Sequence, residues 1–119
     1  MSASQENAEL IDRLLQKTAL QRLRWEAAQG GEAQSFSLKL EDVAFIITKA
    51  DSPTALIYVL TMVDKEQNIL LQVTGRRFSS SGRTDEFFEK LALLFEAARR
   101  SAFSVDEKLR KTMDLLDRL

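Results

Sequence analysis

The residues best suited to chemistry lie in one short segment, 75–84, with the sequence Gly-Arg-Arg-Phe-Ser-Ser-Ser-Gly-Arg-Thr. Guanidinium groups and hydroxyls are side-chain groups that bind phosphate or carboxylate, and the ring of Phe78 could stack on a nucleic-acid base. The segment therefore gives one hypothesis, an anion or nucleic-acid site. Its candidate residues are Arg76, Arg77, Arg83 and Ser79.

Two features argue against an anion site in this segment. Asp85 and Glu86 follow it, where they would occupy the positive end of the next helix and repel an incoming anion. The chain has 17 basic and 18 acidic residues and a net charge of −1, so it has no overall attraction for nucleic acid. The alternative is a solvated connector whose arginines pair with nearby carboxylates.

Catalytic chemistry has little support in the composition. The chain contains no histidine and no cysteine, which excludes an imidazole base, a thiolate nucleophile, a disulfide and metal sites built from those ligands. The carboxylate pairs Glu86/Glu89 and Asp114/Asp117 could bind a hard cation in principle, but basic neighbours or a solvated face favour an ordinary surface role. We therefore expect no enzyme, no cofactor and no metal site.

These residues must be positioned by a single α+β domain spanning residues 1–119. Residues 36–41 alternate apolar and polar side chains, and residues 43–48, 54–63 and 69–74 are rich in β-branched and apolar residues. Both patterns predict strands. Turns at Glu41-Asp42, 49–53 and 64–68 are short, which indicates an antiparallel meander.

The number of strands depends on residues 23–25. Leu23 and Trp25 alternate with charged residues as a strand does, with Gly30 and Gly31 as the following hairpin turn. The same residues could instead prolong the first helix to a stop at those glycines. We favour the strand, and the sheet then has four or five strands.

Three helices flank this sheet. Asn7 is a candidate N-cap for a helix over residues 9–20, which leaves residues 1–7 flexible. Residues 75–82 form a connector, after which Thr84 is a candidate N-cap for a second helix. Ser104 and Glu107 have capping-box spacing and predict a third helix. The apolar residues of that third helix are Leu109, Met113, Leu116 and Leu119.

The central strands are apolar on both sides, which raises the question of what covers them. Either the helices divide between the two faces, or one face is open and larger than the apolar patches that monomers normally tolerate. The second alternative predicts an interface with a partner protein or a second copy. Its candidate residues are Leu56, Tyr58, Leu60 and Met62. The last apolar turn, with Leu115, Leu116 and Leu119, also favours association.

Two stretches of the chain resemble a family of small, largely uncharacterised bacterial proteins with a helix–β-meander–helix organisation. The first is Leu14-Leu15-Gln16-Lys17-Thr18 followed by Leu23-Arg24-Trp25-Glu26, and the second is residues 95–109. The resemblance implies a strand that carries Trp25 and a capped junction between two helices, and it implies no activity. The chain departs from the pattern at residues 19–21, where the resemblance leads us to expect a turn containing glycine.

The sequence also predicts a compartment and a function class. Residues 1–7 are polar and do not resemble a signal peptide, and the apolar stretch 55–60 falls far short of the roughly 20 residues that span a bilayer. We expect a cytoplasmic, bacterial, non-catalytic interaction module that binds a protein partner or forms a homodimer. The alternative is an anion or nucleic-acid binder that uses residues 75–84.

Overall fold

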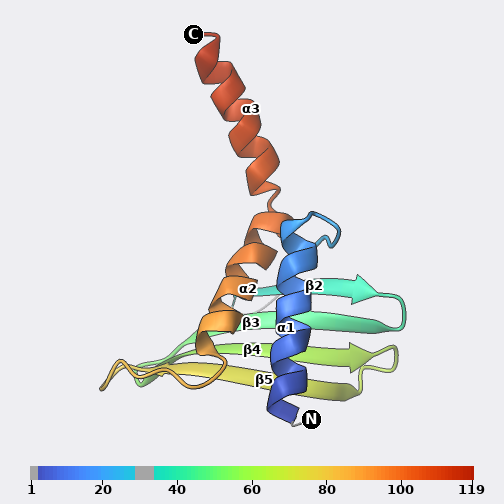
Figure 1. Cartoon of the computed structure of the whole chain (residues 1–119), viewed down its shortest axis with the longest axis vertical. Coiled ribbons are helices and arrows are strands. Elements are labelled where there is room, and N and C mark those ends of the chain that lie inside the picture. Colours follow the sequence, from blue (N-terminus) through green and yellow to red (C-terminus); the bar gives the residue numbers. More distant parts are fainter. Residues whose placement is uncertain (1–2, 29–33) are drawn as a thin grey trace.

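The computed structural model describes residues 3–28 and 34–119. Figure 1 shows an N-terminal helix, an antiparallel sheet and two C-terminal helices, which confirms the predicted α+β class. The helices are α1 (Ala3–Ala19), α2 (Phe88–Ala102) and α3 (Val105–Asp117). The strands are β1 (Glu26–Ala27), β2 (Gln34–Leu40), β3 (Val43–Asp51), β4 (Ala55–Asp64) and β5 (Ile69–Phe78).

The five strands form one antiparallel meander in the order β1-β2-β3-β4-β5. Ile47 of β3 pairs with Leu60 of β4, and Leu60 pairs with Val73 of β5. Directly opposed residues project from the same face of a sheet, so these three side chains lie together, and all three are buried. The register thus assembles one continuous apolar face from three separate strands.

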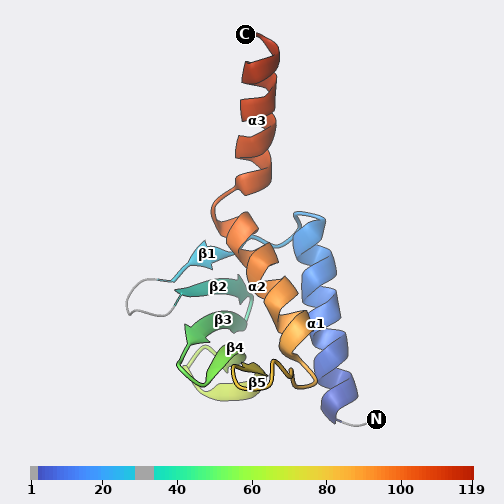
Figure 2. The same ribbon diagram turned by 90° about the vertical axis from the view of Figure 1, so that its left-hand side faces the viewer.

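Helices α1 and α2 lie on the same side of the sheet (Figure 2). Helix α2 packs against the strands, and α1 packs alongside α2. The buried core comprises residues from α1, α2 and β2–β5 together with Trp25. The expectation that helices could divide between the two faces is therefore wrong, because both packed helices cover one face.

The segment that joins α1 to β1 is held by Trp25, which is 1% exposed. Its indole Nε1 donates a hydrogen bond to Thr18 Oγ1 at 3.0 Å, and its backbone N–H donates to Ser101 Oγ at 3.0 Å. Thr18 Oγ1 in turn donates to the carbonyl of Leu14 at 2.7 Å. Trp25 therefore ties the end of α1 to the end of α2, through its side chain and its backbone respectively.

Three predictions at this end of the chain need correction. Helix α1 begins at Ala3, so Asn7 lies inside it and residues 3–7 are helical. Residues 23–25 belong to neither a helix nor a strand, and β1 is limited to Glu26–Ala27. The anchoring of Trp25 from two helices replaces strand pairing there. Gly30 and Gly31 lie outside the described residues.

The predicted connector 75–82 is wrong in its first half, because β5 continues to Phe78. Gly75 is required there, since a Cβ at this position would stand 2.6 Å from the Cα of Phe88. Helix α2 begins only at Phe88, and Thr84 forms an isolated β-bridge with Arg77 instead of a helix cap. Asp85 and Glu86 therefore precede the helix and do not occupy its first turn as predicted; the acidic residue of that turn is Glu89.

The loop before Pro53 is also shorter than predicted, because β3 runs to Asp51.

Helix α3 starts at Val105 as predicted, but without the expected capping box. Ser104 makes no side-chain cap hydrogen bond and has a left-handed backbone, with φ of 52°. This conformation turns the chain between α2 and α3. Helix α3 then projects away from the sheet and the other helices, and it contains no buried residue (Figures 1 and 2).

Candidate docking surface

The four residues of β4 that we expected at an interface face the packed helices. Tyr58 and Leu60 are 7% and 1% exposed, and Leu56 and Met62 are partly buried against the same core. The ring of Tyr58 lies 5.5 Å from the rings of both Phe88 and Phe95 in α2, and burial raises the pKa of its phenol above the usual value. The expectation that these residues form an open surface is wrong, because Tyr58 and Leu60 are buried in the core of one chain and Leu56 and Met62 pack against that core.

The arginines of residues 75–84 do not converge on one site. Arg76 and Arg77 are neighbours in β5, so their side chains point to opposite faces of the sheet. The guanidinium of Arg77 lies over the ring of Phe88, 5.4 Å from its centroid. Arg83 closes the turn after β5 by accepting a hydrogen bond from Phe78 N–H at its carbonyl, and Ser79 is exposed nearby.

The sheet face opposite the helices is a mixed surface of β-branched side chains. Thr48, Val59 and Thr74 are directly opposed on β3, β4 and β5, and all three are partly exposed. Ile46 and Ile57 lie on the same face and are also partly exposed. Hydroxyls interrupt the apolar side chains, so this face is less continuous than the sequence pattern indicates.

A further exposed apolar surface lies on α3. We call it the α3 stripe and define it as Leu109, Met113 and Leu116. These side chains are 51%, 58% and 62% exposed. Their spacing of four and then three residues places them on one side of the helix, and Leu119 just beyond the helix is also exposed. The sequence predicted these residues as one apolar helix side, but nothing local showed that no other element would cover it.

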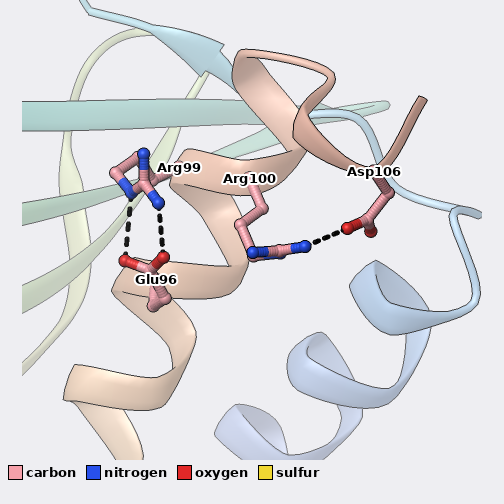
Figure 3. Close-up of polar contacts among 4 residues, drawn as sticks. All are labelled: Glu96, Arg99, Arg100 and Asp106. Carbon is pink, nitrogen blue, oxygen red and sulfur yellow. Dashed lines mark hydrogen bonds and ion pairs between the residues drawn. The ribbon is translucent and has the colours of Figure 1, made fainter. Parts of the chain in front are cut away.

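The start of α3 is braced against α2 and the loop after α1. Arg100 of α2 forms an ion pair with Asp106 in the first turn of α3 (Figure 3), and Arg24 Nη2 lies 3.5 Å from Ser104 Oγ. The ring of Phe103 packs edge-on against that of Phe36 at 5.8 Å. These contacts hold the base of α3, while its remaining turns stand clear of the domain.

Also in α2, Glu96 and Arg99 form a two-pronged ion pair, with nitrogen–oxygen distances of 2.6 and 3.0 Å (Figure 3). The hydrogen bonds from Arg99 hold the pKa of the Glu96 carboxyl below its usual value. The pair lies on the surface, since the Glu96 side chain is half exposed. We assign it a structural role within α2.

A cavity of about 380 Å³ lies between the end of α1 and the start of α3. Its lining includes Arg24, Arg100, Ser101, Asp106 and Glu107. Arg100 and Asp106 already pair with each other, and Ser101 bonds to Trp25. The polar groups of the cavity are therefore largely engaged in joining the helices.

The charges of α3 are arranged unevenly around the stripe. Lys111 and Glu107 form an ion pair at 3.2 Å on the side away from it. Arg110 and Asp117 lie seven residues apart and so share one edge of the stripe. Neither makes a salt bridge within residues 3–28 and 34–119.

The described part of the chain has neither a metal-binding cluster nor a membrane-spanning helix. No cluster of three or more His, Cys, Asp or Glu side chains with metal-binding geometry occurs there. Among the same residues, no helix combines the length and apolar character needed to cross a bilayer. No protein family model, curated protein or solved structure matches this chain.

Proposed function

We propose that this protein is a non-catalytic protein–protein interaction module that docks through α3. The observation that carries the proposal is the α3 stripe, in which three apolar side chains at helical spacing are each more than half exposed. An amphipathic helix normally buries its apolar side against another element. Here no element within the described residues covers it.

Helix stability supports the same proposal. Isolated helices shorter than about 12–15 residues are marginal in water, and most helices in proteins are stabilised by packing of their apolar side. Helix α3 has 13 residues, of which none is buried. A partner that covers the stripe would supply the packing that the chain itself does not provide.

Site-specific photo-crosslinking in living cells tests this function. A photoreactive phenylalanine analogue replaces Leu116 in the stripe, and in a matched control it replaces Asp114, which points away from the stripe. We expect ultraviolet light to form a protein adduct with the probe at 116 and little adduct with the probe at 114. Equal adducts from both positions, or none from either, would contradict docking through the stripe.

A second candidate function is binding of an anion or nucleic acid near the turn after β5. It is favoured by one observation, that Arg76, Arg77 and Arg83 make no salt bridge within the described ranges. This candidate predicts salt-sensitive binding of a single-stranded oligonucleotide, lost when all three arginines are replaced by alanine. No gel shift at low salt would reject it.

The remaining parts of the proposal rest on the sequence. We propose a bacterial, cytoplasmic protein, in keeping with the resemblance of residues 14–18, 23–26 and 95–109 to small bacterial proteins. That resemblance adds no activity. The absence of histidine and cysteine from the chain supports a binding role over a catalytic one.

A further inference from the structure

We infer that the partner of α3 is the α3 of a second copy of this chain, packed antiparallel to it. The inference rests on the proposed function and names its partner. Three observations support it: the spacing of the α3 stripe, the charges along its edge, and the projection of α3 from the domain.

The stripe has the spacing of a two-helix seam. Leu109, Met113 and Leu116 are separated by four and three residues, as are the d, a and d positions of a coiled-coil heptad. With this assignment the apolar residues point at the partner helix, and the Glu107–Lys111 ion pair remains on the outside. A second copy presents the same seam, so the two stripes can bury each other.

The charges at the edge of the stripe select the antiparallel orientation. Arg110 and Asp117 both fall at the e position of this heptad, and e positions face each other in an antiparallel pair. Arg110 of one copy then lies opposite Asp117 of the other, and the two-fold axis generates this pair twice. In a parallel pair, e positions face g positions, which here are the uncharged Val105 and Thr112 within α3 and Leu119 just beyond it. Only the antiparallel pair therefore brings opposite charges together.

The shape of the molecule permits this arrangement. Helix α3 extends beyond the sheet and both other helices (Figure 1), so a second helix can lie along it with its own domain at the opposite end. The helix is about 20 Å long, given a rise of 1.5 Å per residue. A contact of that length buries less than the roughly 1,600 Å² of a standard interface. We therefore expect a weak dimer that dissociates in the micromolar range.

Sedimentation equilibrium of the purified full chain between about 1 and 200 µM tests the pairing. We expect the average mass to rise with concentration from that of a monomer towards that of a dimer. Leu116→Asp should abolish the rise, because it places a charge in the seam. Asp114→Ala, on the outer side of α3, should leave it unchanged. Near-ultraviolet circular dichroism of buried Trp25 reports whether each variant keeps its fold.

Charge reversal tests the orientation. Arg110→Asp and Asp117→Arg should each weaken the dimer about 3- to 10-fold, since each places like charges together twice. The double variant Arg110→Asp/Asp117→Arg restores opposite charges and should return to within about twofold of the original dissociation constant. A double variant weaker than either single variant would overturn the antiparallel arrangement.

The outcomes separate this inference from the proposed function. A chain that stays monomeric to 200 µM overturns self-pairing, while a position-116 adduct with another protein would still uphold docking through α3. A dimer that forms equally with Leu116→Asp overturns self-pairing through the stripe. If position 116 also gives no adduct, the proposed function fails as well.

Discussion

Trp25 and Thr18 are joined by a buried hydrogen bond, in which the indole Nε1 donates to the threonine Oγ1 at 3.0 Å. The bond connects the last turn of α1 to the segment leading into β1. Because Ser101 of α2 accepts from the backbone of the same tryptophan, the two helices and the edge of the sheet share one anchor. This anchor therefore holds α1, α2 and the segment before β1 together.

Replacing Thr18 with valine should destabilise the fold by about 1–3 kcal/mol, because the buried Trp25 N–H loses its acceptor. Thr18→Ser keeps an Oγ and should cost less. Urea unfolding followed by tryptophan fluorescence measures both variants. A loss for valine no larger than the loss for serine would contradict a dominant contribution from the hydrogen bond, because valine keeps the methyl group and serine keeps the Oγ.

Gly75→Ala should cost about 3 kcal/mol, the upper end of the range for overpacking. Its Cβ would lie 2.6 Å from the Cα and 2.7 Å from the N of Phe88, and these are backbone atoms that can move only if α2 moves. Gly82→Ala is the matched control. No atom lies within 4 Å of its Cβ, and its φ of 69° predicts a strain of about 1 kcal/mol. Chemical denaturation measures the free energy of unfolding of both variants. A smaller loss for Gly75→Ala than for Gly82→Ala would contradict the close contact with α2.

Replacing a leucine by alanine should change the free energy of unfolding much more in α2 than in α3. Leu91 of α2 is fully buried, so Leu91→Ala should cost about 2–5 kcal/mol. Leu116→Ala in the α3 stripe should change the free energy of unfolding by less than about 0.5 kcal/mol when the chain is dilute enough to be monomeric. Thermal unfolding at such a concentration provides the measurement. A large loss from Leu116→Ala would mean that α3 packs within its own chain.

Stability should fall in acid partly through Asp64, which organises the turn between β4 and β5. Hydrogen bonds from the side chain and backbone of Asn68 hold the pKa of this carboxyl below its usual value, with a further contribution from Glu66. A carboxyl whose pKa is lower in the folded state stabilises the fold above its unfolded pKa of about 3.8, and the stabilisation is lost as the pH falls through the folded pKa. Asp64→Asn should therefore be less stable than the original at pH 7, and the difference should shrink towards pH 3. Urea midpoints across this range measure it, and a difference independent of pH would contradict the ionic origin.

Local periodicity in the chain was sufficient to predict the class of fold. Alternating and β-branched runs specify strands, three- and four-residue spacing specifies helices, and short turns require an antiparallel meander. These signals act between near neighbours. They predict the ends of elements less reliably. The local structure at Gly75 and Trp25 depends on contacts with α2, which lies far away in the sequence.

The sequence by itself therefore determined the α+β class, the order of its elements and the amphipathic character of α3. Only the tertiary structure decided which apolar surface is covered. The register that aligns Ile47 with Leu60 and Val73, together with the packing of α2 on that face, buries the strand residues that looked like an interface. The turn at Ser104 directs α3 away and leaves its stripe open. Burial is a property of contacts between distant segments, and so periodicity could show that a side is apolar but not what lies against it.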